Sequence, residues 1–500
     1  MTRRLDPDFT ALPYEALGGA ALERAQALGV THADFRLERH RAQFVVCRDR
    51  ELETNVNVDT QGYSVRVIHN GAWGFASGID LTTDAAATVA ARAVEVARTL
   101  ASLNSEPVVL SDEPVYTDTH ISNYEVDPFS VGDEDKIAFL LGLNARLLDS
   151  KKVDQAQSYA QLVLENKYFA SLAGSRITQQ RVRVNAEFVA VRVNKETGAF
   201  ETMGPAAPPV GRGWEYFTGG YNYARDADEI PDLLEEKMRA PSVEPGRYDL
   251  VIHPSNLFLT IHESIGHSTE LDRVLGYEAN YAGTSFATLD KLNTLRFGSP
   301  VMNVTGDRVA EHGLSTIGYD DEGVAAQTWD IIKDGVLVGY QLNRQTAEKQ
   351  GFGRSNGCAF ADSPGHVPLQ RMPNVSLQPS PKDISIDDLI GGVEDGIYIV
   401  GDKSWSIDMQ RYNFQFTGQK FFRIRGGKLD GQLKDVAYQS KTTDFWNSME
   451  AVGGPSTYVL GGAFNCGKGQ PGQVAPVSHG APAALFRQVN ILNTTAEGSQ

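Results

Sequence analysis

Cysteine is scarce in this chain, which has three in 500 residues. An odd and small number of cysteines argues against a disulfide framework and favours a reducing compartment. No run of 18 apolar residues occurs, so no membrane-spanning helix is expected. Residues 1–7 are not followed by an apolar segment, so we expect no secretory signal. Together these absences predict a cytoplasmic protein that has no membrane as a partner.

Positive charge is also in short supply. The chain has 46 basic and 63 acidic residues, which gives a formal net charge of -17. This sign disfavours nucleic acid and anionic membranes as main partners. The composition is otherwise that of an ordinary globular protein, with 41% hydrophobic and 22% charged residues. A chain of this length can bury two or three cores, so we expect more than one domain.

Helix and strand patterns alternate in the first half of the chain. An Asn-Gly turn at 70–71 predicts a hairpin within a group of strands. The segment 241–246, which contains two prolines and a glycine, is the best linker candidate. We therefore predict an N-terminal α+β domain, an α/β sandwich-like unit, over residues 1–240. The predicted helices cover 12–28, 82–103, 134–148 and 228–239, and the predicted strands fall within 33–76 and 153–193.

The second half is richer in glycine and in hairpin signals. Asp334-Gly335 and Gly426-Gly427 each separate two short apolar runs. Many short strands around a single helix predict a β-rich, barrel-like domain. The sequence thus predicts a two-domain α+β protein, in which residues 241–500 form the domain that carries the metal-site helix.

The segment His262-Glu-Ser-Ile-Gly-His267 contains the residue types of a metal site. Zinc peptidases commonly carry His-Glu-x-x-His, because residues four apart share one helix face. Here the histidines are five apart, which would separate the rings by about 140° around a regular helix. A π-turn would absorb the extra residue and restore a shared face, and such turns gather at functional sites. We therefore predict a metal-site helix with a local π-turn.

The surrounding residues favour a helix that follows a strand. The apolar run 247–253 predicts the strand, and the Ser or Asn at 255–256 can cap the helix. An apolar stripe over 257–274 indicates how far the helix extends. Gly266 would weaken a regular helix by about 1 kcal/mol. It suits a distorted turn or the close approach of another backbone.

The motif alone does not decide the function. A His-Glu-x-x-x-His pattern should arise by chance in about one in a hundred such chains. The alternative that both histidines are ordinary half-buried residues therefore stays open. Glu270 lies near one helical turn beyond His267, and it either orients a His ring as a hydrogen-bond acceptor or is a solvated helix charge.

The three cysteines differ in their surroundings. Cys47 lies in a strand-like run and is most simply a small buried hydrophobe. Cys358 follows a Gly-rich segment, in a flexible loop where a contact role is conceivable but unsupported. Cys466 lies in the Gly-rich segment 461–472, which can bend around a thiolate, and Lys468 would help to hold negative charge there. Taken alone, such a loop cysteine is more often a bystander.

Other polar residues also have two explanations. Asp320-Asp321-Glu322 could line a cavity or bind a cation, but an acidic run that ends in Gly is more often a solvated turn. Arg371 and Asn374 could hold backbone or a substrate carboxylate, and a packing role is as plausible. Lone histidines are more often structural than metal ligands, and this expectation covers His253, His312, His366 and His479.

In combination, these pieces resemble the TldD/PmbA family of zinc metallopeptidases. The resemblance covers most of the chain and is more specific than any single motif. Its matching segments are Gly62–Val67, Gly71–Ala76, His262–His267 with Glu270, Tyr319–Gly323, Asp334–Tyr340, Arg371–Asn374, Glu394–Tyr398 and Cys466–Lys468.

The resemblance implies that His262, His267 and Cys466 bind Zn²⁺ and that Glu263 is the catalytic carboxylate. Two neutral imidazoles and one thiolate leave a tetrahedral position for water, as in catalytic rather than structural zinc sites. Zinc would lower the pKa of that water, and Glu263 could take its proton and pass it to the leaving amine.

We therefore expect a zinc-dependent peptidase that cleaves short or unfolded peptides. An extended peptide could add as a strand to a sheet edge near the metal. The family also implies an enclosed site between subunits, hence a homodimer or a heterodimer with a member that lacks the motif. Two alternatives remain: a non-catalytic or scaffold subunit of a TldD-type heteromeric protease, and a metal-dependent hydrolase of a non-peptide amide.

Overall fold

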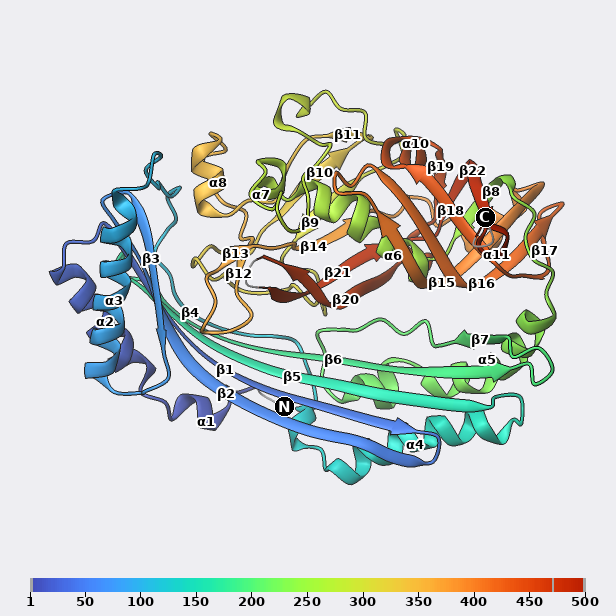
Figure 1. Ribbon diagram of the computed structural model, residues 1–500, viewed down its shortest axis with the longest axis horizontal. Helices are drawn as coiled ribbons and strands as arrows, with labels where there is room; N and C mark the ends of the chain where they lie inside the picture. The colour runs from blue at the N-terminus through green and yellow to red at the C-terminus, as the bar shows by residue number, and fades with distance from the viewer. Residues whose placement is uncertain (1–2, 470–471, 498–500) are drawn as a thin grey trace.

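Two β-structures organise the molecule (Figure 1), in a computed structural model that describes residues 3–469 and 472–497. The N-terminal half is built on a seven-stranded sheet in the order β3-β2-β1-β5-β6-β4, with β7 also paired to β6. The predicted hairpin turn at Asn70-Gly71 joins β2 to β3, and both residues have positive φ. The strands are β1 (His32–Arg48), β2 (Glu51–His69), β3 (Ala72–Gly78), β4 (Thr117–Ile121), β5 (Gln155–Ser171), β6 (Arg176–Val193) and β7 (Phe200–Met203).

Helices cover one face of this sheet in two groups. One group packs on Phe35 and Tyr63, and the other packs on Leu162 and Phe188. Burying a side chain of this size contributes about 2–3 kcal/mol. All four helices were predicted, although the last begins at Tyr223 rather than at residue 228. They are α2 (Tyr14–Ala27), α3 (Thr83–Ala101), α4 (Asp133–Asp149) and α5 (Tyr223–Arg239), and a short α1 (Pro7–Thr10) precedes them.

The opposite face of the sheet is charged, and the C-terminal half covers it. Lys167 Nζ lies 2.9 Å from Asp321 Oδ2, and Arg66 Nη1 lies 3.0 Å from Glu322 Oε1. The prediction of a solvated turn at 320–322 is therefore wrong, because all three acidic residues are buried. Lys167 and Arg66 lie 154 and 256 residues from Asp321 and Glu322 in the chain, so only the folded structure pairs them.

The C-terminal half contains a closed five-stranded barrel in the order β15-β8-β22-β18-β16, with β16 paired back to β15. This confirms the predicted barrel-like fold. Trp446 and Phe486 are fully buried in its core. The strands are β8 (Gly246–Ile252), β15 (Asp395–Ile407), β16 (Asn413–Arg425), β18 (Val436–Lys441) and β22 (Ala484–Asn493), and β17 (Lys428–Leu433) and β19 (Met449–Val452) extend the sheet.

Smaller elements pack around the barrel. A four-stranded sheet has the order β11-β10-β9-β14, and β20 and β21 form a separate hairpin. The predicted turns at Asp334-Gly335 and Gly426-Gly427 are present. Among the described residues, no helix is both long and apolar enough to cross a membrane. The remaining elements are α6 (Pro254–Ile261), α7 (Leu271–Val274), α8 (Arg344–Lys349), α9 (Ile386–Gly391), α10 (Thr442–Asn447), α11 (Thr494–Glu497), β9 (Val304–Asp307), β10 (Thr328–Lys333), β11 (Val336–Leu337), β12 (Ala359–Phe360), β13 (Leu369–Gln370), β14 (Asn374–Leu377), β20 (Val459–Lys468) and β21 (Gln473–Ala481).

Candidate metal centre

The helix that carries the motif is fixed to the barrel. It follows β8 directly, as predicted, and Pro254 occupies its first turn. Its N-cap is His253 rather than Ser255 or Asn256, because His253 Nδ1 accepts a hydrogen bond from Ser255 N. Asn256 Nδ2 donates to the carbonyl oxygens of Gly401 and Thr417 at 2.9 and 2.8 Å. The helix is therefore fastened to β15 and β16 before the motif begins.

The predicted π-turn is present. It spans His262–Gly266, and a single 3₁₀ turn follows at His267–Thr269. The ring centroids of His262 and His267 lie 4.7 Å apart, so the turn places both imidazoles on one side. A Cβ at Gly266 would lie 2.5 Å from the sulfur of Met372. Glycine is thus needed here because a side chain, rather than another backbone, approaches closely.

The third candidate ligand comes from the hairpin. Cys466 lies in β20 opposite Ala475 of β21, so the prediction of a loop is wrong at this residue. Its Sγ lies 3.6 Å from Nε2 of His267. The potential ligand atoms of His262, His267 and Cys466 all lie within 4.8 Å of one another, and the three side chains are buried.

Hydrogen bonds fix which nitrogen of His262 is free. His479 Nδ1 lies 2.9 Å from the carbonyl of Val375, which can only accept, so the neutral ring of His479 must accept at Nε2. His262 Nδ1 lies 2.7 Å from that Nε2 and therefore donates to it. This leaves Nε2 of His262 unprotonated. Burial lowers the pKa of His262 and His267, which favours the neutral form that binds metals.

A carboxylate orients the second imidazole in the same way. His267 Nδ1 donates to Glu270 Oε2 at 2.8 Å, which leaves Nε2 directed at Cys466. Glu270 is fully buried, so it is not a solvated helix charge. Burial opposes its ionisation, but Lys468, His267 and Arg273 hold the pKa of Glu270 well below its usual value.

Lys468 has a different role from the one predicted. Its Nζ contacts Glu270 Oε1 at 3.0 Å, Asp272 Oδ2 at 2.8 Å and the carbonyl of Gln370 at 2.8 Å. It therefore neutralises the carboxylates behind His267 instead of the thiolate. This ion cluster ties the end of β20 to the start of α7, and its three side chains are buried.

The thiol of Cys466 is held from the opposite side. Burial raises its pKa, but His267 and Arg371 outweigh that effect, and the net pKa of Cys466 is lowered. Arg371 donates to the Cys466 carbonyl and, at 3.2 Å, to the carbonyl of Gln473. Arg371 thus holds backbone, which is one of the three roles predicted for it. Asn374 likewise accepts from the backbone of Ser315.

Glu263, the predicted catalytic carboxylate, forms an ion pair. Its Oε2 lies 2.8 Å from Nη1 of Arg411, whose Nη2 donates to the carbonyl of Ala282. Arg411 belongs to the connection between β15 and β16 and has a φ of 62°, which is uncommon for a residue other than glycine. The ion pair holds Glu263 in one orientation next to the paired imidazoles.

The remaining cysteines and lone histidines do not join this cluster of ligand atoms. Cys47 packs in the apolar core beneath α4, as predicted. Cys358 is fully buried beside Asn356, and burial raises its pKa to about 11. His312 contacts Arg212, and His366 contacts Asp362.

A metal ion fits this donor set. Two buried neutral imidazoles present unprotonated nitrogens, and a cysteine with a lowered pKa faces one of them. Nitrogen and thiolate donors in this number are typical of zinc, and three protein ligands are typical of a catalytic site. Hydrogen bonds from His479 and Glu270 supply the outer support that such imidazoles usually have.

Comparison with known protein families shows which family this chain belongs to. Residues 245–493 match the model described as the PmbA/TldA metallopeptidase C-terminal domain, and residues 33–97 match PmbA/TldA metallopeptidase domain 1. The chain belongs to the PmbA/TldD family. A metalloprotease of Methanothermobacter thermautotrophicus is 27% identical over 93% of this chain and 96% of its own length. A zinc metalloprotease TldD homolog of Saccharolobus solfataricus is 23% identical over 94% of this chain and 98% of its own length.

Solved structures share the fold. TldE from Thermococcus kodakarensis has a TM-score of 0.70 and 14% identity, and the match covers 95% of this chain and 99% of TldE. A protein of Thermotoga maritima has a TM-score of 0.77 and 14% identity, over 96% of this chain and all of that one. The PmbA/TldD fold therefore extends over nearly the whole chain.

Sequence reasoning missed two residues at the metal centre. His479 was treated as a lone structural histidine, and Arg411 was not considered at all. The signal for His479 is a histidine within an apolar strand pattern, where a buried imidazole needs partners on both nitrogens. We find no local sequence signal for Arg411, because its partner Glu263 lies 148 residues away.

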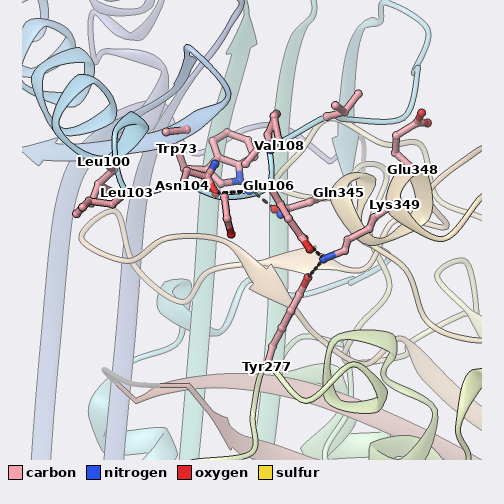
Figure 2. A pocket seen from close by; sticks show the side chains of 14 residues that line it. Trp73, Leu100, Leu103, Asn104, Glu106, Val108, Tyr277, Gln345, Glu348 and Lys349 are labelled. Atoms are coloured by element: carbon pink, nitrogen blue, oxygen red, sulfur yellow. Dashed lines mark hydrogen bonds and ion pairs between the residues drawn. The ribbon is translucent and has the colours of Figure 1, made fainter.

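A large surface hollow lies elsewhere, between α3 and α8 (Figure 2). It has a volume of about 820 Å³, and Trp73, Leu103 and Tyr277 are among its lining residues. Lys349 bridges Glu106 and the hydroxyl of Tyr277 across it. None of the candidate metal ligands lines this hollow, so it is not part of the metal centre.

Proposed function

We propose that this PmbA/TldD family member is a zinc-dependent peptidase. The observation that carries the proposal is the arrangement of two neutral imidazoles whose free Nε2 atoms lie beside the Cys466 thiol, with Glu263 adjacent. The names of the relatives, metalloprotease and zinc metalloprotease TldD homolog, support the same activity.

His262, His267 and Cys466 would hold the zinc ion. When bound, the ion would polarise the scissile carbonyl and make a water molecule acidic at neutral pH. Glu263 would accept a proton from that water and transfer it to the leaving amine. Arg411 keeps this carboxylate in position through the 2.8 Å ion pair. Glu270 and His479 keep the two imidazoles in the tautomer that binds metal.

The substrates would be short or unfolded peptides. Among the described residues, β20 pairs with no strand other than β21, and we propose that a peptide adds as a strand at its other edge. Main-chain hydrogen bonds to such an edge do not depend on peptide sequence. A folded protein cannot present an extended strand to a site whose candidate ligands are this deeply buried.

The proposal also covers the oligomeric state, the domains and the cellular location of the protein. The likeness to TldE supports a heterodimer with a family member that lacks the motif, and a homodimer is the other arrangement. We also propose that residues 1–240 and 241–500 are the two domains and that the protein is cytoplasmic. A scaffold subunit or a hydrolase of non-peptide amides are the competing functions.

The decisive experiment combines Glu263→Gln with Cys466→Ala. If the proposal is correct, Glu263→Gln abolishes peptide hydrolysis but retains about one zinc per chain, because it removes no ligand. Cys466→Ala loses both zinc and activity. A scaffold would show no hydrolysis in the wild type and would lose folding or assembly when zinc is chelated. Hydrolysis restricted to non-peptide amides would favour the third function.

A further inference from the structure

A second cavity lies where the N-terminal sheet meets the barrel. It has a volume of about 310 Å³, and its walls come from β6, β7 and the loop 204–209 on one side and from α6, β15, β16 and β20 on the other. Figure 1 shows the segment after β7 running between the two halves. The polar and aromatic side chains that line the cavity include Glu187, Ser255, Phe258, Asp402 and Gln419.

Two carboxylates give this cavity its charge. Asp402 makes no hydrogen bond or ion pair with another described side chain, whereas Glu187 Oε1 accepts from Asn185 Nδ2 at 3.2 Å. Burial, together with the Glu187 carboxylate, raises the pKa of Asp402 to about 6. Lys403 also lines the cavity, but its side chain is 42% exposed and contacts Glu201 rather than Asp402 or Glu187. Asp402 and Glu187 are both half-buried and neither is paired with a cationic side chain in the described part of the chain, so the cavity favours a positive ligand.

Two of the elements that line the cavity, α6 and β20, lead to the candidate metal ligands: His262 and His267 follow α6, and Cys466 lies in β20. Gly461 of β20 lies against Phe258 of α6 at the cavity, since a Cβ there would be 2.8 Å from that of Phe258. Further along both elements, Cys466 lies against His267. The turn that extends α6 and the strand β20 therefore run in the same direction, from the cavity to the metal centre.

The lengths of α6 and β20 give the distance between the cavity and the candidate metal centre. Seven helical residues from Ser255 to His262 rise by about 10 Å, and five strand residues from Gly461 to Cys466 span about 16 Å. An extended peptide covers about 3.3 Å per residue. A peptide with its scissile bond at the metal centre would thus reach the cavity three to five residues away.

We propose that this cavity is a substrate subsite that binds a cationic nitrogen of the peptide, three to five residues from the bond that is cleaved. The inference rests on the proposed peptidase function. The nitrogen can belong to the free amino terminus of the peptide or to a Lys or Arg side chain. Asp402 and Glu187 are the specificity-determining residues, and the ring of Phe258 can add a cation–π contact.

Hydrolysis of two peptide series tests the subsite and separates the sources. In the first, one Lys is moved through an otherwise uncharged peptide with both ends blocked. In the second, peptides of increasing length carry either a free or an acetylated amino terminus. We expect kcat/KM to rise about tenfold when the positive charge lies three to five residues from the cleaved bond. Asp402→Asn and Glu187→Gln should each reduce the ratio of kcat/KM for the charged peptide to kcat/KM for the neutral peptide severalfold.

A control on the same strand distinguishes the cavity from general electrostatics. Asp395 of β15 is exposed, pairs with Arg423 and does not line the cavity. Asp395→Asn should leave the ratio unchanged. Equal kcat/KM for charged and neutral peptides, or a ratio that survives both Asp402→Asn and Glu187→Gln, would overturn the proposal while leaving peptidase activity intact.

A measurement of peptide binding tests the proposed subsite independently of hydrolysis. Fluorescence anisotropy with the Glu263→Gln protein measures the affinity for labelled Lys-containing and neutral peptides. The Lys-containing peptide should bind about tenfold more tightly, and adding Asp402→Asn should remove that difference. If no peptide is hydrolysed by the wild type, the proposed function fails, and the binding ratio still shows whether the subsite exists.

Discussion

At the scale of single residues, the candidate metal centre depends on side chains that are not themselves candidate ligands. His479 accepts the Nδ1 proton of His262, and Glu270 accepts that of His267. Each acceptor leaves one imidazole nitrogen free for a ligand bond. The motif identifies the two imidazoles and the adjacent carboxylate, but it does not identify His479, which lies 217 residues from His262.

The variant His479→Phe tests how much the hydrogen bond from His262 to His479 contributes to zinc binding. The ring is fully buried, so a phenyl ring of similar shape fills the same space without its acceptor. We expect zinc affinity to fall about 10- to 100-fold, as for other groups that orient zinc ligands. Competition with a chelator of known affinity measures the change. The zinc-free protein should lose about 1–3 kcal/mol of unfolding free energy for each buried group left without a partner, namely His262 Nδ1 and the Val375 carbonyl. A loss of this size with unchanged zinc affinity would mean that His479 does not orient His262 for the metal.

At the scale of elements, a π-turn solves the problem of a five-residue spacing between the histidines. The turn was predictable because only such a distortion brings the two rings together, and it is present at His262–Gly266. The sequence did not show that Cys466 lies in a strand. Its glycines indicate a loop, but pairing with β21 satisfies the backbone of β20 and overrides that local tendency.

Gly266→Ala tests the tight packing of the turn. The new Cβ would lie 2.5 Å from the Met372 sulfur, so we expect a loss of about 1–3 kcal/mol in unfolding free energy and weaker zinc binding. Adding Met372→Ala should relieve the clash. Gly142 in α4 has no atom within 4 Å of a new Cβ. There, Gly→Ala should stabilise by about 0.5–1 kcal/mol. Equal effects at both glycines would contradict the packing explanation.

The N-cap of α6 should make stability depend on pH. Burial, together with Lys420, lowers the pKa of His253 to about 4, below its ordinary value of 6.5. The folded state therefore favours the neutral ring, so its contribution is complete above pH 6.5 and is lost as the pH falls toward 4. Between pH 7 and pH 5 we expect this effect to lower the free energy of unfolding by about 1–2 kcal/mol.

Denaturant unfolding of His253→Asn measures the cap directly. Asparagine is a good N-cap that does not titrate, so the variant should keep most of its stability at pH 7. Between pH 7 and pH 5, His253→Asn should lose about 1–2 kcal/mol less unfolding free energy than the wild type does. An unchanged difference between the two pH values would show that His253 does not titrate in this range.

At the scale of the whole molecule, an ionic contact joins the two halves. The charged face of the N-terminal sheet meets Asp321 and Glu322, and Lys167 and Arg66 are almost completely buried there. Such pairs are costly to form but more costly to break, because one partner is left charged and unpaired. They join the segment between β9 and β10 to the N-terminal sheet, and the cavity near Asp402 also lies between the two halves.

Asp321→Asn should destabilise the protein by about 3–5 kcal/mol, because it leaves Lys167 without its main partner. The double variant Asp321→Asn with Lys167→Met should recover much of this loss. Calorimetry or denaturant unfolding can compare the four proteins of the cycle. High salt should not reproduce the effect, since a buried pair is poorly screened. If the single variant is as stable as the wild type, the contact does not hold the halves together.

The sequence by itself determined the local features: the principal helices, the hairpin turns, the β-rich second half and the distorted His-Glu-x-x-x-His helix. These follow from periodicity, turn chemistry and the spacing of neighbouring residues, which act over a few positions. Tertiary structure alone decided which distant groups meet. Glu263, His262 and Glu322 have Arg411, His479 and Arg66 as partners, each more than 100 residues away in sequence, and a single sequence carries no signal for such pairings.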